Sequence, residues 1–226
     1  MSIRFELVSK RFEDREALGD ISFMVEPGEF VFVTGHSGAG KSTLLKLLAL
    51  IERPTAGIIE VFGERLSKIP RRQLARYRRQ LGLVFQDHRL LMDRSAFENV
   101  ALPLRLDGYS EEAIARRVPA ALAQVGLGGR ERAFPAQLST GEQQRLGIAR
   151  AVVAAPKLLL ADEPTGNLDP QLAVEIMELF VSLKSQGTTV IVASHDLPLI
   201  QKIRRRTIVL ERGRQIDDFR PEDAHA

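Results

Sequence analysis

Short hydrophobic blocks recur along this chain, and their spacing predicts strands that alternate with helices. Apolar and polar positions alternate over 3–9, which indicates a strand with one buried face. Two further strands are expected at 21–25 and 30–34. The runs LLLAD at 158–162 and TTVIVAS at 188–194 are continuously apolar, as in parallel strands that are buried on both faces.

Helices are predicted between these strands. A leucine-rich helix runs from Lys41 to about Ile51, and another occupies about 170–185. The segment 70–80, PRRQLARYRRQ, is predicted to be a basic helix. Two short strands and a hairpin complete the set, at 58–62, at 81–85 and around Arg212–Gly213.

From about residue 87 to 154 the pattern changes to mostly helix. Ser110, followed by two glutamates, is a favourable helix start. Pro119 is expected to kink or restart that helix. The order of elements predicts an α/β core formed by about 1–86 and 155–226, with a helical subdomain inserted between these two parts.

Composition limits the class of protein. The 226 residues are 44% hydrophobic and 27% charged, with a net charge of +3, which is ordinary for a folded soluble domain. No cysteine is present, so disulfides and thiol chemistry are excluded. No apolar run approaches a membrane-spanning length, and the first ten residues lack the apolar core of a signal peptide. We therefore expect a cytoplasmic protein.

The stretch GHSGAGKST at 35–43 is a candidate phosphate-binding loop. It matches G-x-x-x-x-G-K-[ST], follows a predicted strand and opens a predicted helix, as that pattern requires. Its backbone N–H groups and the helix N-terminus supply positive potential for phosphates. Lys41 is expected to reach the β- and γ-phosphates, and Ser42 to bind Mg²⁺. The predicted nucleotide-binding residues of the loop are Gly35, His36, Ser37, Gly38, Ala39, Gly40, Lys41, Ser42 and Thr43.

Two acids at the end of LLLADE form the second part of the candidate site. Asp162 closes a buried strand that we expect beside the strand of the glycine loop, where Mg²⁺ takes its second protein contact. Glu163 is then expected to face the γ-phosphate and to polarise the attacking water. The alternative is that the strand simply meets solvent at two acids, which is the weaker interpretation once the glycine loop is considered.

A second phosphate-binding helix start is predicted at QLSTGEQQR, 137–145. It combines a serine, a glycine and a polar run that favours a helix, so its first turn offers backbone N–H groups to an anion. One glycine loop already surrounds one triphosphate. The second helix start therefore either folds back onto the same nucleotide or meets the nucleotide of another molecule.

Five motifs in a fixed order resemble those of the ATP-binding subunits of the ABC transporter superfamily. They are GHSGAGKST, VFQD at 84–87, LSTGEQQR at 138–145, LLLADEPTGNLD at 158–169 and ASHD at 193–196. The resemblance spans essentially the whole chain. It implies a P-loop NTPase fold with a RecA-like core and an antiparallel β subdomain. It also implies ATP hydrolysis by a head-to-tail homodimer that encloses two ATP molecules.

The resemblance implies roles for single residues around the nucleotide. Phe12 would stack on adenine, unless it is ordinary packing at a strand end. Gln86 would contact Mg²⁺ and sense the γ-phosphate. His195 would hold the γ-phosphate in the closed dimer, and would act with Lys41 and Glu163 in catalysis.

Other roles would lie across the dimer interface. Ser139 and Gly141 are expected to touch the partner's γ-phosphate, and Asp169 to cross the interface. The signature departs from the family's commoner Leu-Ser-Gly-Gly-Gln, because Thr140 replaces a glycine and Glu142 replaces the glutamine. Thr140 adds a side chain near the second ATP, which either weakens the cap or adds a hydrogen bond. Glu142 is expected to lie toward the helix body.

Within the superfamily, the glycine-loop segment and FQDHRLLMDRSAFENVALPL resemble the bacterial cell-division ATP-binding subunits. That resemblance implies a polytopic membrane partner that docks near Gln86–Phe97, and through it an indirect effect on cell-wall hydrolases and division proteins. It also implies a location on the cytoplasmic face of the bacterial inner membrane. The candidate docking residues, which could instead form the small core of the helical subdomain, are Leu90, Leu91, Met92 and Phe97.

Two other functions are open at this point. The ATPase of a lipoprotein-releasing or efflux transporter would share PTGNLD, so this motif does not separate the two. A soluble nucleotide-dependent switch on nucleic acid or ribosomes would draw support from the basic runs at 71–79 and 204–206. Such relatives usually carry two ATPase units in one chain, and a solvated face or one near anionic lipid headgroups is the simpler explanation of these runs. We therefore expect no nucleic acid partner.

Overall fold

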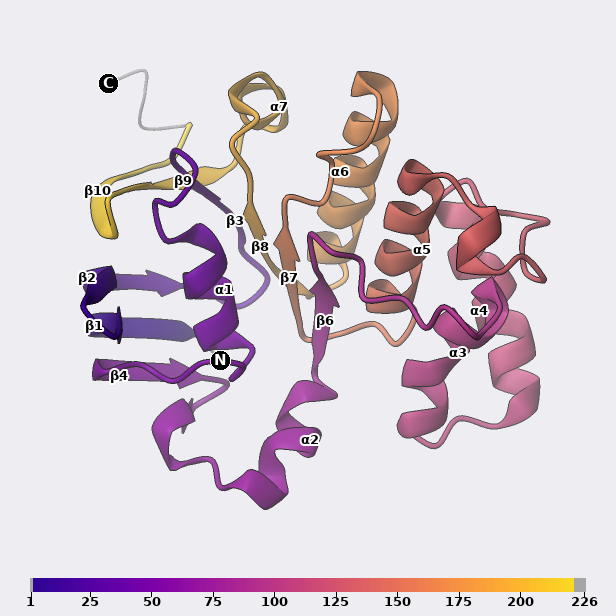
Figure 1. The fold of residues 1–226 in the computed structure, drawn as a ribbon, viewed down its shortest axis with the longest axis horizontal. Helices are drawn as coiled ribbons and strands as arrows, with labels where there is room; N and C mark the ends of the chain where they lie inside the picture. Colours follow the sequence, from indigo (N-terminus) through magenta and orange to yellow (C-terminus); the bar gives the residue numbers. More distant parts are fainter. Residues whose placement is uncertain (1, 222–226) are drawn as a thin grey trace.

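The computed structural model describes residues 2–221 and has an α/β architecture around a six-stranded sheet (Figure 1). The strand order in this main sheet is β10-β9-β3-β8-β7-β6. Its last strand, β10, pairs antiparallel with β9, and the other neighbours are parallel. The strands are β3 (Phe30–Thr34), β6 (Leu81–Val84), β7 (Leu158–Asp162), β8 (Thr189–Ala193), β9 (Arg206–Glu211) and β10 (Arg214–Phe219). The predicted α/β class is confirmed.

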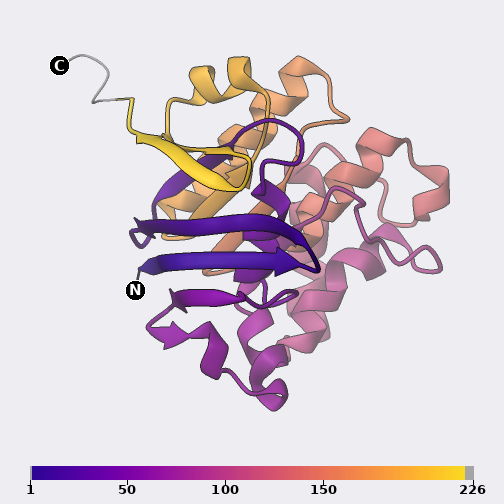
Figure 2. The ribbon, with the colours of Figure 1, turned by 60° about the vertical axis from the view of Figure 1, so that its left-hand side comes forward.

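A second, antiparallel sheet lies beside the main one, in the order β2-β1-β4-β5. Figure 2 brings this sheet to the front. Helix α1 (Lys41–Leu48) packs between the two sheets, against β2 on one side and against β7 and β8 on the other. The strands of this sheet are β1 (Ile3–Phe12), β2 (Arg15–Val25), β4 (Ala56–Val61) and β5 (Glu64–Arg65).

Strand β3 is buried on both faces and separates two hydrophobic cores. Phe30 and Phe32 pack into the core that the main sheet shares with the helices of the opposite face. Val31 and Val33 pack into the core between the main sheet, α1 and the antiparallel sheet. The period of two along a strand explains this division, and the glycine loop that follows β3 therefore starts from a rigid position.

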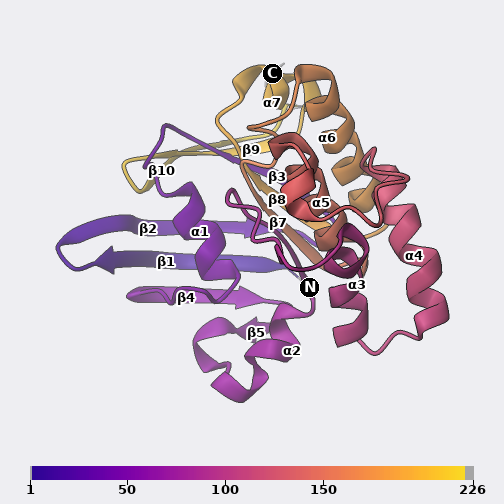
Figure 3. The ribbon, with the colours of Figure 1, turned by 45° about the vertical axis from the view of Figure 1, so that its right-hand side comes forward.

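Five further helices lie on the side of the main sheet away from the antiparallel sheet (Figure 3). They are α3 (Ala96–Leu106), α4 (Glu111–Gln124), α5 (Thr140–Val152), α6 (Pro170–Ser185) and α7 (Leu197–Ile203). The first three pack on one another and come between β6 and β7 in the chain. We therefore propose that the helical subdomain spans about 87–154. Within residues 2–221, no helix is both long enough and apolar enough to cross a membrane.

Two predicted elements differ most from their expected lengths, whereas the strand predicted at 3–9 extends to Phe12 and the helix from Lys41 ends at Leu48. Strand β2 begins at Arg15 rather than at 21, because its first half pairs with β1 down to the register Phe12↔Arg15. This pairing supplies hydrogen-bond partners for the backbone groups of 15–20. The largely polar pattern of this stretch does not indicate a strand. The expected basic helix at 70–80 is shorter, since a 3₁₀ turn at Arg71–Gln73 leads into α2 (Leu74–Arg78).

A restart of the helix at Pro119, one of the two expected outcomes, does not occur. Helix α4 runs from Glu111 to Gln124 with Pro119 in its interior. Its start at the Ser110 cap is as predicted, because the Ser110 side chain accepts from the Ala113 N–H. A proline inside a helix costs a helical hydrogen bond, about 3 kcal/mol, and the buried face of Ile114, Val118 and Leu122 offsets this cost.

Candidate functional site

The structure gathers most of the predicted nucleotide-binding residues around one cleft of about 920 Å³. This cleft lies at the carboxyl end of β3, the edge of a parallel sheet where ligands usually bind. Its walls come from segments that are far apart in the sequence. The predicted residues that line it are Phe12, Gly35, His36, Ser37, Gly38, Ala39, Gly40, Lys41, Ser42, Thr43, Gln86, Glu163 and His195.

Two glycines of the loop are required by conformation and by space. Gly35 has φ 144° and Gly40 has φ 108°, both in the region that L side chains rarely adopt. A Cβ on Gly40 would lie 2.6 Å from a methyl carbon of Leu18, and a Cβ on Gly35 would collide with the carbonyl oxygen of Leu210. The loop therefore follows the neighbouring strands closely and turns its backbone toward the cleft.

Lys41 is held inside the loop. Only 8% of its side chain is exposed, and Nζ donates to the Gly35 carbonyl at 2.7 Å and to the His36 carbonyl at 3.3 Å. Glu163 Oε1 lies 3.7 Å from the same Nζ. The ammonium group therefore sits at the N-terminus of α1, where it adds to the positive end of the helix dipole.

Ser42 and Asp162 form a second polar pair beside the loop. The Ser42 hydroxyl donates to Asp162 Oδ1 at 3.0 Å. Burial raises the pKa of Asp162 above its usual range, with the Ser42 hydrogen bond opposing the rise. A divalent cation next to this carboxylate would offset its burial, and hydroxyl and carboxylate oxygens are the ligands that Mg²⁺ prefers.

The residues around this pair fit a metal that completes its coordination on a substrate. No cluster of three or more His, Cys, Asp or Glu side chains with metal-binding geometry occurs among the described residues. Two protein oxygens are too few for a closed metal site. Mg²⁺ bound by one or two protein groups together with phosphate oxygens and water is the usual arrangement in phosphoryl-transfer sites.

The strand that ends at Asp162 does not lie beside the strand of the glycine loop, as we expected from the sequence. Strand β8 separates β7 from β3 in the main sheet. Helix α1 bridges this separation. It packs on both β7 and β8, and it carries Ser42 in its first turn to the end of β7. The glycine loop and the acid therefore meet through a helix rather than through neighbouring strands.

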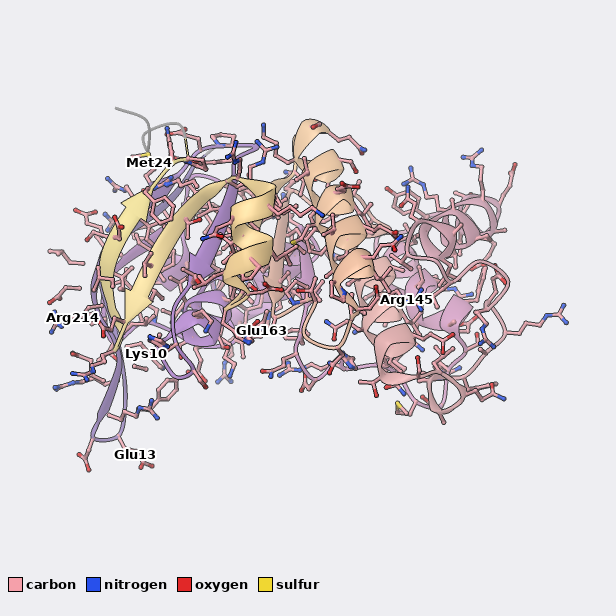
Figure 4. All side chains as sticks on the ribbon, turned by 90° about the horizontal axis from the view of Figure 1, so that it is seen from above. Lys10, Glu13, Met24, Arg145, Glu163 and Arg214 are labelled. Carbon is pink, nitrogen blue, oxygen red and sulfur yellow. The ribbon has the colours of Figure 1, made fainter. Side chains whose placement is uncertain are left out.

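Glu163 and His195 face each other across the ends of β7 and β8. Glu163 Oε1 lies 2.9 Å from His195 Nδ1. Glu163 has φ 48°, an unfavourable conformation for a side chain with a Cβ, and its N–H donates to the Ala193 carbonyl at 2.9 Å. This backbone bond aims the carboxylate into the cleft, where Figure 4 shows Glu163 near the middle of the molecule.

Reciprocal hydrogen bonds between Ser139 and Glu142 cap the start of α5. Ser139 Oγ accepts from the Glu142 N–H at 3.2 Å, and Glu142 Oε2 accepts from the Ser139 N–H at 2.9 Å. This capping box lowers the pKa of Glu142, chiefly through the hydrogen bond from the Ser139 backbone. Glu142 is the third residue of helix α5, and its side chain folds back onto the helix start. The N–H groups of Thr140 and Gly141 are not used by this box.

The signature residues do not line the cleft of their own chain. Ser139, Gly141 and Asp169 are absent from its walls. Gly141 packs near the Asn167 carbonyl oxygen, and Asp169 accepts from the N–H groups of Gln171 and Leu172 as the cap of α6. In Figure 4, Arg145 of the same helix α5 lies among the helices to one side of Glu163. The start of α5 therefore does not fold back onto the nucleotide cleft of its own chain.

Phe12, at the end of β1, lines the cleft. Its side chain is 41% exposed, and Lys10 Nζ lies 4.5 Å from the ring centroid. The ring is therefore available for stacking and is not buried as strand-end packing.

Several residues of the cleft were not predicted from the sequence. Ile216 and Glu211 reach it because the hairpin of β9 and β10 passes beside the glycine loop, and Leu197 reaches it from the start of α7. Arg15 and Ala17 reach it from the first half of β2, the half that the hydrophobic pattern missed. No local motif identifies these residues as part of the cleft, because only the packing of the two sheets brings them beside the glycine loop.

A further residue that sequence reasoning missed joins the helical subdomain (the helical lobe) to the loop that carries Gln86 (the glutamine loop). Arg150 of α5 donates to the carbonyls of His88 and Arg89, at 2.7 Å each. His88 and Arg89 have φ values of 54° and 46°, two strained residues in succession just after Gln86. The Arg150 guanidinium therefore holds the loop that carries Gln86 to the same helix that begins at the signature.

The four candidate docking residues divide into two pairs. Leu90 and Phe97 are partly buried against the core of the helical lobe. Leu91 and Met92 are 38% and 55% exposed. Fully buried Asn99 holds this loop, because it accepts from the Leu91 N–H and donates to the Leu91 carbonyl.

Comparison with known proteins gives consistent results along almost the whole chain. A family model described as ABC transporter matches residues 18–166. The cell division ATP-binding protein FtsE of Escherichia coli K12 is 53% identical over 212 residues, which cover 93% of this chain and 96% of that protein. FtsE of Mycobacterium tuberculosis is 44% identical over 220 residues, with 96% of each chain covered.

Solved structures of a bacterial ABC transporter cassette, MJ0796, have the same fold. Its dimeric structure has a TM-score of 0.92 at 33% identity, with 97% of this chain and 98% of that chain covered. A dimeric post-hydrolysis state bound to ADP and Pi has a TM-score of 0.91 at 32% identity. The ordered motifs, the cleft that they build and the identity over nearly the full length show that this chain belongs to the ABC transporter ATP-binding family, among the FtsE cell division ATP-binding proteins.

Proposed function

We propose that this chain binds and hydrolyses ATP in a cell-division ABC complex. Two copies enclose two ATP molecules, and the cycle passes through an FtsX-like polytopic membrane protein to control cell-wall hydrolysis. The observation that carries the proposal is the single cleft that buried Lys41, Gln86 and the Glu163–His195 pair all line, with the Ser42–Asp162 pair at its edge. Its relatives among cell division ATP-binding proteins support the biological setting.

The residues of the cleft divide the work on ATP between binding and hydrolysis. The loop 35–43 wraps the phosphates, and Lys41 neutralises charge on the β- and γ-phosphates. Glu163 takes a proton from the attacking water as general base. His195, which touches the Glu163 carboxylate, keeps that carboxylate oriented and donates toward the γ-phosphate. Phe12, whose ring is exposed, stacks on the adenine ring.

Magnesium is the implied metal of this site. Ser42, Asp162 and Gln86 would hold it, the first two through the oxygens that already lie 3.0 Å apart. When bound, Mg²⁺ neutralises charge on the β- and γ-phosphate oxygens. Gln86 lies on the loop that Arg150 ties to α5, so the position of the helical lobe and the metal contact change together.

The signature helix is proposed to cap the nucleotide of a second copy. The solved relatives are dimeric cassettes, and in one of them the nucleotide is ADP with Pi. Within this chain, Ser139 and Gly141 lie outside the cleft, and the N–H groups of Thr140 and Gly141 are not used by the capping box. In a closed twofold dimer, each glycine loop holds one ATP, and each signature helix caps the ATP of the other copy.

Ser139→Arg tests this cap. We expect the variant to bind ATP as a monomer with unchanged affinity and to lose ATP-dependent dimerisation, because an arginine side chain fills the space of the partner's γ-phosphate. Sedimentation velocity with and without MgATP measures the effect. Ser139→Ala is the matched control, since it removes the same helix cap, worth about 1 kcal/mol, without adding bulk. An arginine variant that still dimerises with ATP would show that this helix start caps nothing.

Arg150→Ala tests the link between α5 and the glutamine loop. We expect kcat to fall about tenfold and the Mg²⁺ requirement to rise, with ATP affinity nearly unchanged, because Gln86 loses its fixed position while the glycine loop is intact. Arg150→Lys should recover part of the loss. Steady-state kinetics over a Mg²⁺ series measures both values.

Arg145→Ala is the matched control for Arg150. Arg145 lies on the same helix and also donates to two carbonyls, those of Val125 and Gly126, at 3.1 Å each. Both variants should lose stability, on the order of 2 kcal/mol for a charged group that bonds two carbonyls. Equal Mg²⁺ dependence in the two variants would mean that Arg150 only stabilises the fold.

The proposed partner docks on the exposed residues of the loop after Gln86, with the chain located at the cytoplasmic face of the bacterial inner membrane. Affinity capture from detergent-solubilised membranes, followed by mass spectrometry, tests this. We expect one polytopic protein with a large extracytoplasmic domain. Met92→Glu should abolish the capture. Leu7→Glu should not, although Leu7 is 62% exposed, because Leu7 lies on β1, away from this loop.

The capture experiment separates the alternatives that the sequence leaves open. Recovery of a lipoprotein-release or efflux protein would retain the ATPase chemistry and replace the division role. Recovery of ribosomes or nucleic acid without any membrane protein would contradict the membrane setting. Capture of the polytopic partner by Met92→Glu at the normal level would move the docking surface elsewhere.

A further inference from the structure

The segment 64–80 carries a concentrated excess of positive charge. It contains seven basic residues and one acidic residue, a net charge of +6. The whole chain has a net charge of only +3, so the residues outside this segment sum to −3. The segment runs from β5 to the start of β6 through two 3₁₀ turns, Leu66–Lys68 and Arg71–Gln73, and α2. One short stretch of surface therefore differs in sign from the rest of the molecule.

Three arginines of the segment serve the fold. Arg65 pairs with Glu60, and Arg78 donates to the carbonyls of Ala49 and Leu50 after α1. Arg79 donates to the Leu106 carbonyl at the end of α3. Four basic residues are left, all exposed and without a hydrogen bond or ion pair from their side chains to any residue of 2–221. This basic face consists of Lys68, Arg71, Arg72 and Arg76.

The basic face and the nucleotide cleft lie at opposite edges of the main sheet. The strands β3, β8, β7 and β6 are parallel, so their carboxyl ends share one edge and their amino ends the other. The glycine loop follows the carboxyl end of β3, whereas α2 directly precedes the amino end of β6. Figure 1 shows α2 at the bottom of the molecule, away from the loop above α1. Four free cations at this edge therefore have no role in the ATP site.

The chemistry of this face points to one kind of partner. We propose that the basic face binds anionic lipid headgroups, so that the chain has a membrane contact of its own in addition to any partner protein. Leu106, 58% exposed, lies beside the Arg79 guanidinium and supplies an apolar contact at the edge of the face. The nearby aromatic ring of Tyr77 is buried, with its hydroxyl donating to the Leu48 carbonyl, so it offers no platform for stacking bases. A bilayer surface therefore matches this face better than a nucleic acid does.

The expected strength follows from the number of free cations. Each Lys or Arg near an anionic membrane contributes about 1 kcal/mol, which is roughly a fivefold gain in partitioning. Four such residues give a gain on the order of several hundredfold over a neutral surface, and salt screens it because all four are exposed. The contact is therefore reversible, and a dimer that presents two basic faces binds more strongly than one chain.

Vesicle co-sedimentation of the full chain, without any membrane protein, tests the proposal. Vesicles of phosphatidylcholine alone are compared with vesicles that also contain phosphatidylglycerol. We expect binding only to the anionic vesicles, with a loss at high salt. The variant Arg71→Gln, Arg72→Gln, Arg76→Gln should bind about 100-fold more weakly, from three fivefold losses.

A second triple variant removes the same charge elsewhere. Arg116→Gln, Arg132→Gln, Lys202→Gln replaces three exposed residues of the helical side that make no side-chain hydrogen bond or ion pair within 2–221, and it should bind anionic vesicles normally. ATP hydrolysis and thermal unfolding of both triple variants in solution should match those of the parent chain. These solution measurements keep the failure of the two proposals distinguishable. If the proposed ATPase function were wrong, the parent chain would not hydrolyse ATP in solution, whereas vesicle binding alone decides the lipid contact.

Three results would overturn the proposal. Equal binding to neutral and anionic vesicles would exclude headgroup charge as the cause. An equal loss in both triple variants would assign the effect to net charge rather than to this face. Salt-dependent binding of a single-stranded RNA that exceeds vesicle binding, and that is lost in the first triple variant alone, would assign the face to nucleic acid instead.

Discussion

Glu163→Gln should hydrolyse ATP about 10²- to 10⁴-fold more slowly than the parent chain while binding it with similar affinity, because the amide cannot accept the proton of the attacking water. The change keeps the size of the side chain, and the amide can still accept a hydrogen bond from His195, whose Nδ1 lies 2.9 Å from the carboxylate. ATP that is bound and not hydrolysed should hold the two copies together. Phosphate release and sedimentation velocity with MgATP measure the two effects.

Glu178→Gln is the control for this substitution. Glu178 lies on α6, is exposed and has no ion pair within residues 2–221, so the same chemical change there should leave turnover and dimerisation as they are. The double variant Glu163→Gln with Ser139→Arg adds a sharper test. It should bind ATP and remain monomeric, since the cap is blocked. Near-normal turnover of Glu163→Gln would remove this residue from its assigned role.

Lys41→Ala should lose ATP affinity by at least about 100-fold, because a hydrogen bond to a charged group is worth about 1.5–3 kcal/mol and this ammonium can make more than one to phosphate oxygens. The lysine also donates to the carbonyls of Gly35 and His36, so its removal loosens the loop as well. Equilibrium binding of a fluorescent ATP analogue measures the loss, and thermal unfolding measures the change in stability.

Lys41→Met separates these two effects. Methionine retains most of the aliphatic stem that fills the loop and removes the charge, so it should keep more of the stability and bind ATP as weakly as the alanine variant does. Lys202→Ala, an exposed lysine of α7, is the control for general loss of charge. Unchanged nucleotide affinity in both Lys41 variants would contradict the assignment of the glycine loop.

Local patterns predicted many elements correctly. Strand β7 at 158–162 and helix α6 at 170–185 have the expected bounds, and the hairpin turns at Arg212–Gly213 between β9 and β10. These elements are specified by their own residues: a continuous apolar run, a proline at the first helical position after the Asp169 cap, and a glycine with φ 81° at the turn. Such signals act over a few residues, so they can be recognised without knowing the fold.

Some local expectations failed because packing outweighs propensity. Pro119 lies inside an unbroken helix, since the apolar side of α4 is buried in the helical lobe. The polar first half of β2 is a strand because β1 supplies its hydrogen-bond partners. In both cases the decisive contacts come from another element, and the residues themselves carry no sign of them.

For the site, the sequence by itself determined which stretches carry the candidate chemistry. The loop 35–43, the acids at 162 and 163, and the signature at 138–145 are contiguous stretches whose residue types are typical of phosphate, metal and helix-start contacts. Only the tertiary structure decided how these stretches meet. It places β8 between β7 and β3, brings Glu163 to His195, and ties Arg150 to the loop after Gln86. It also shows which cations of 64–80 are used by the fold and which are free. These relations join residues that are far apart in the chain, and they arise from the order of strands in a sheet and the burial of shared faces, which local spacing does not encode.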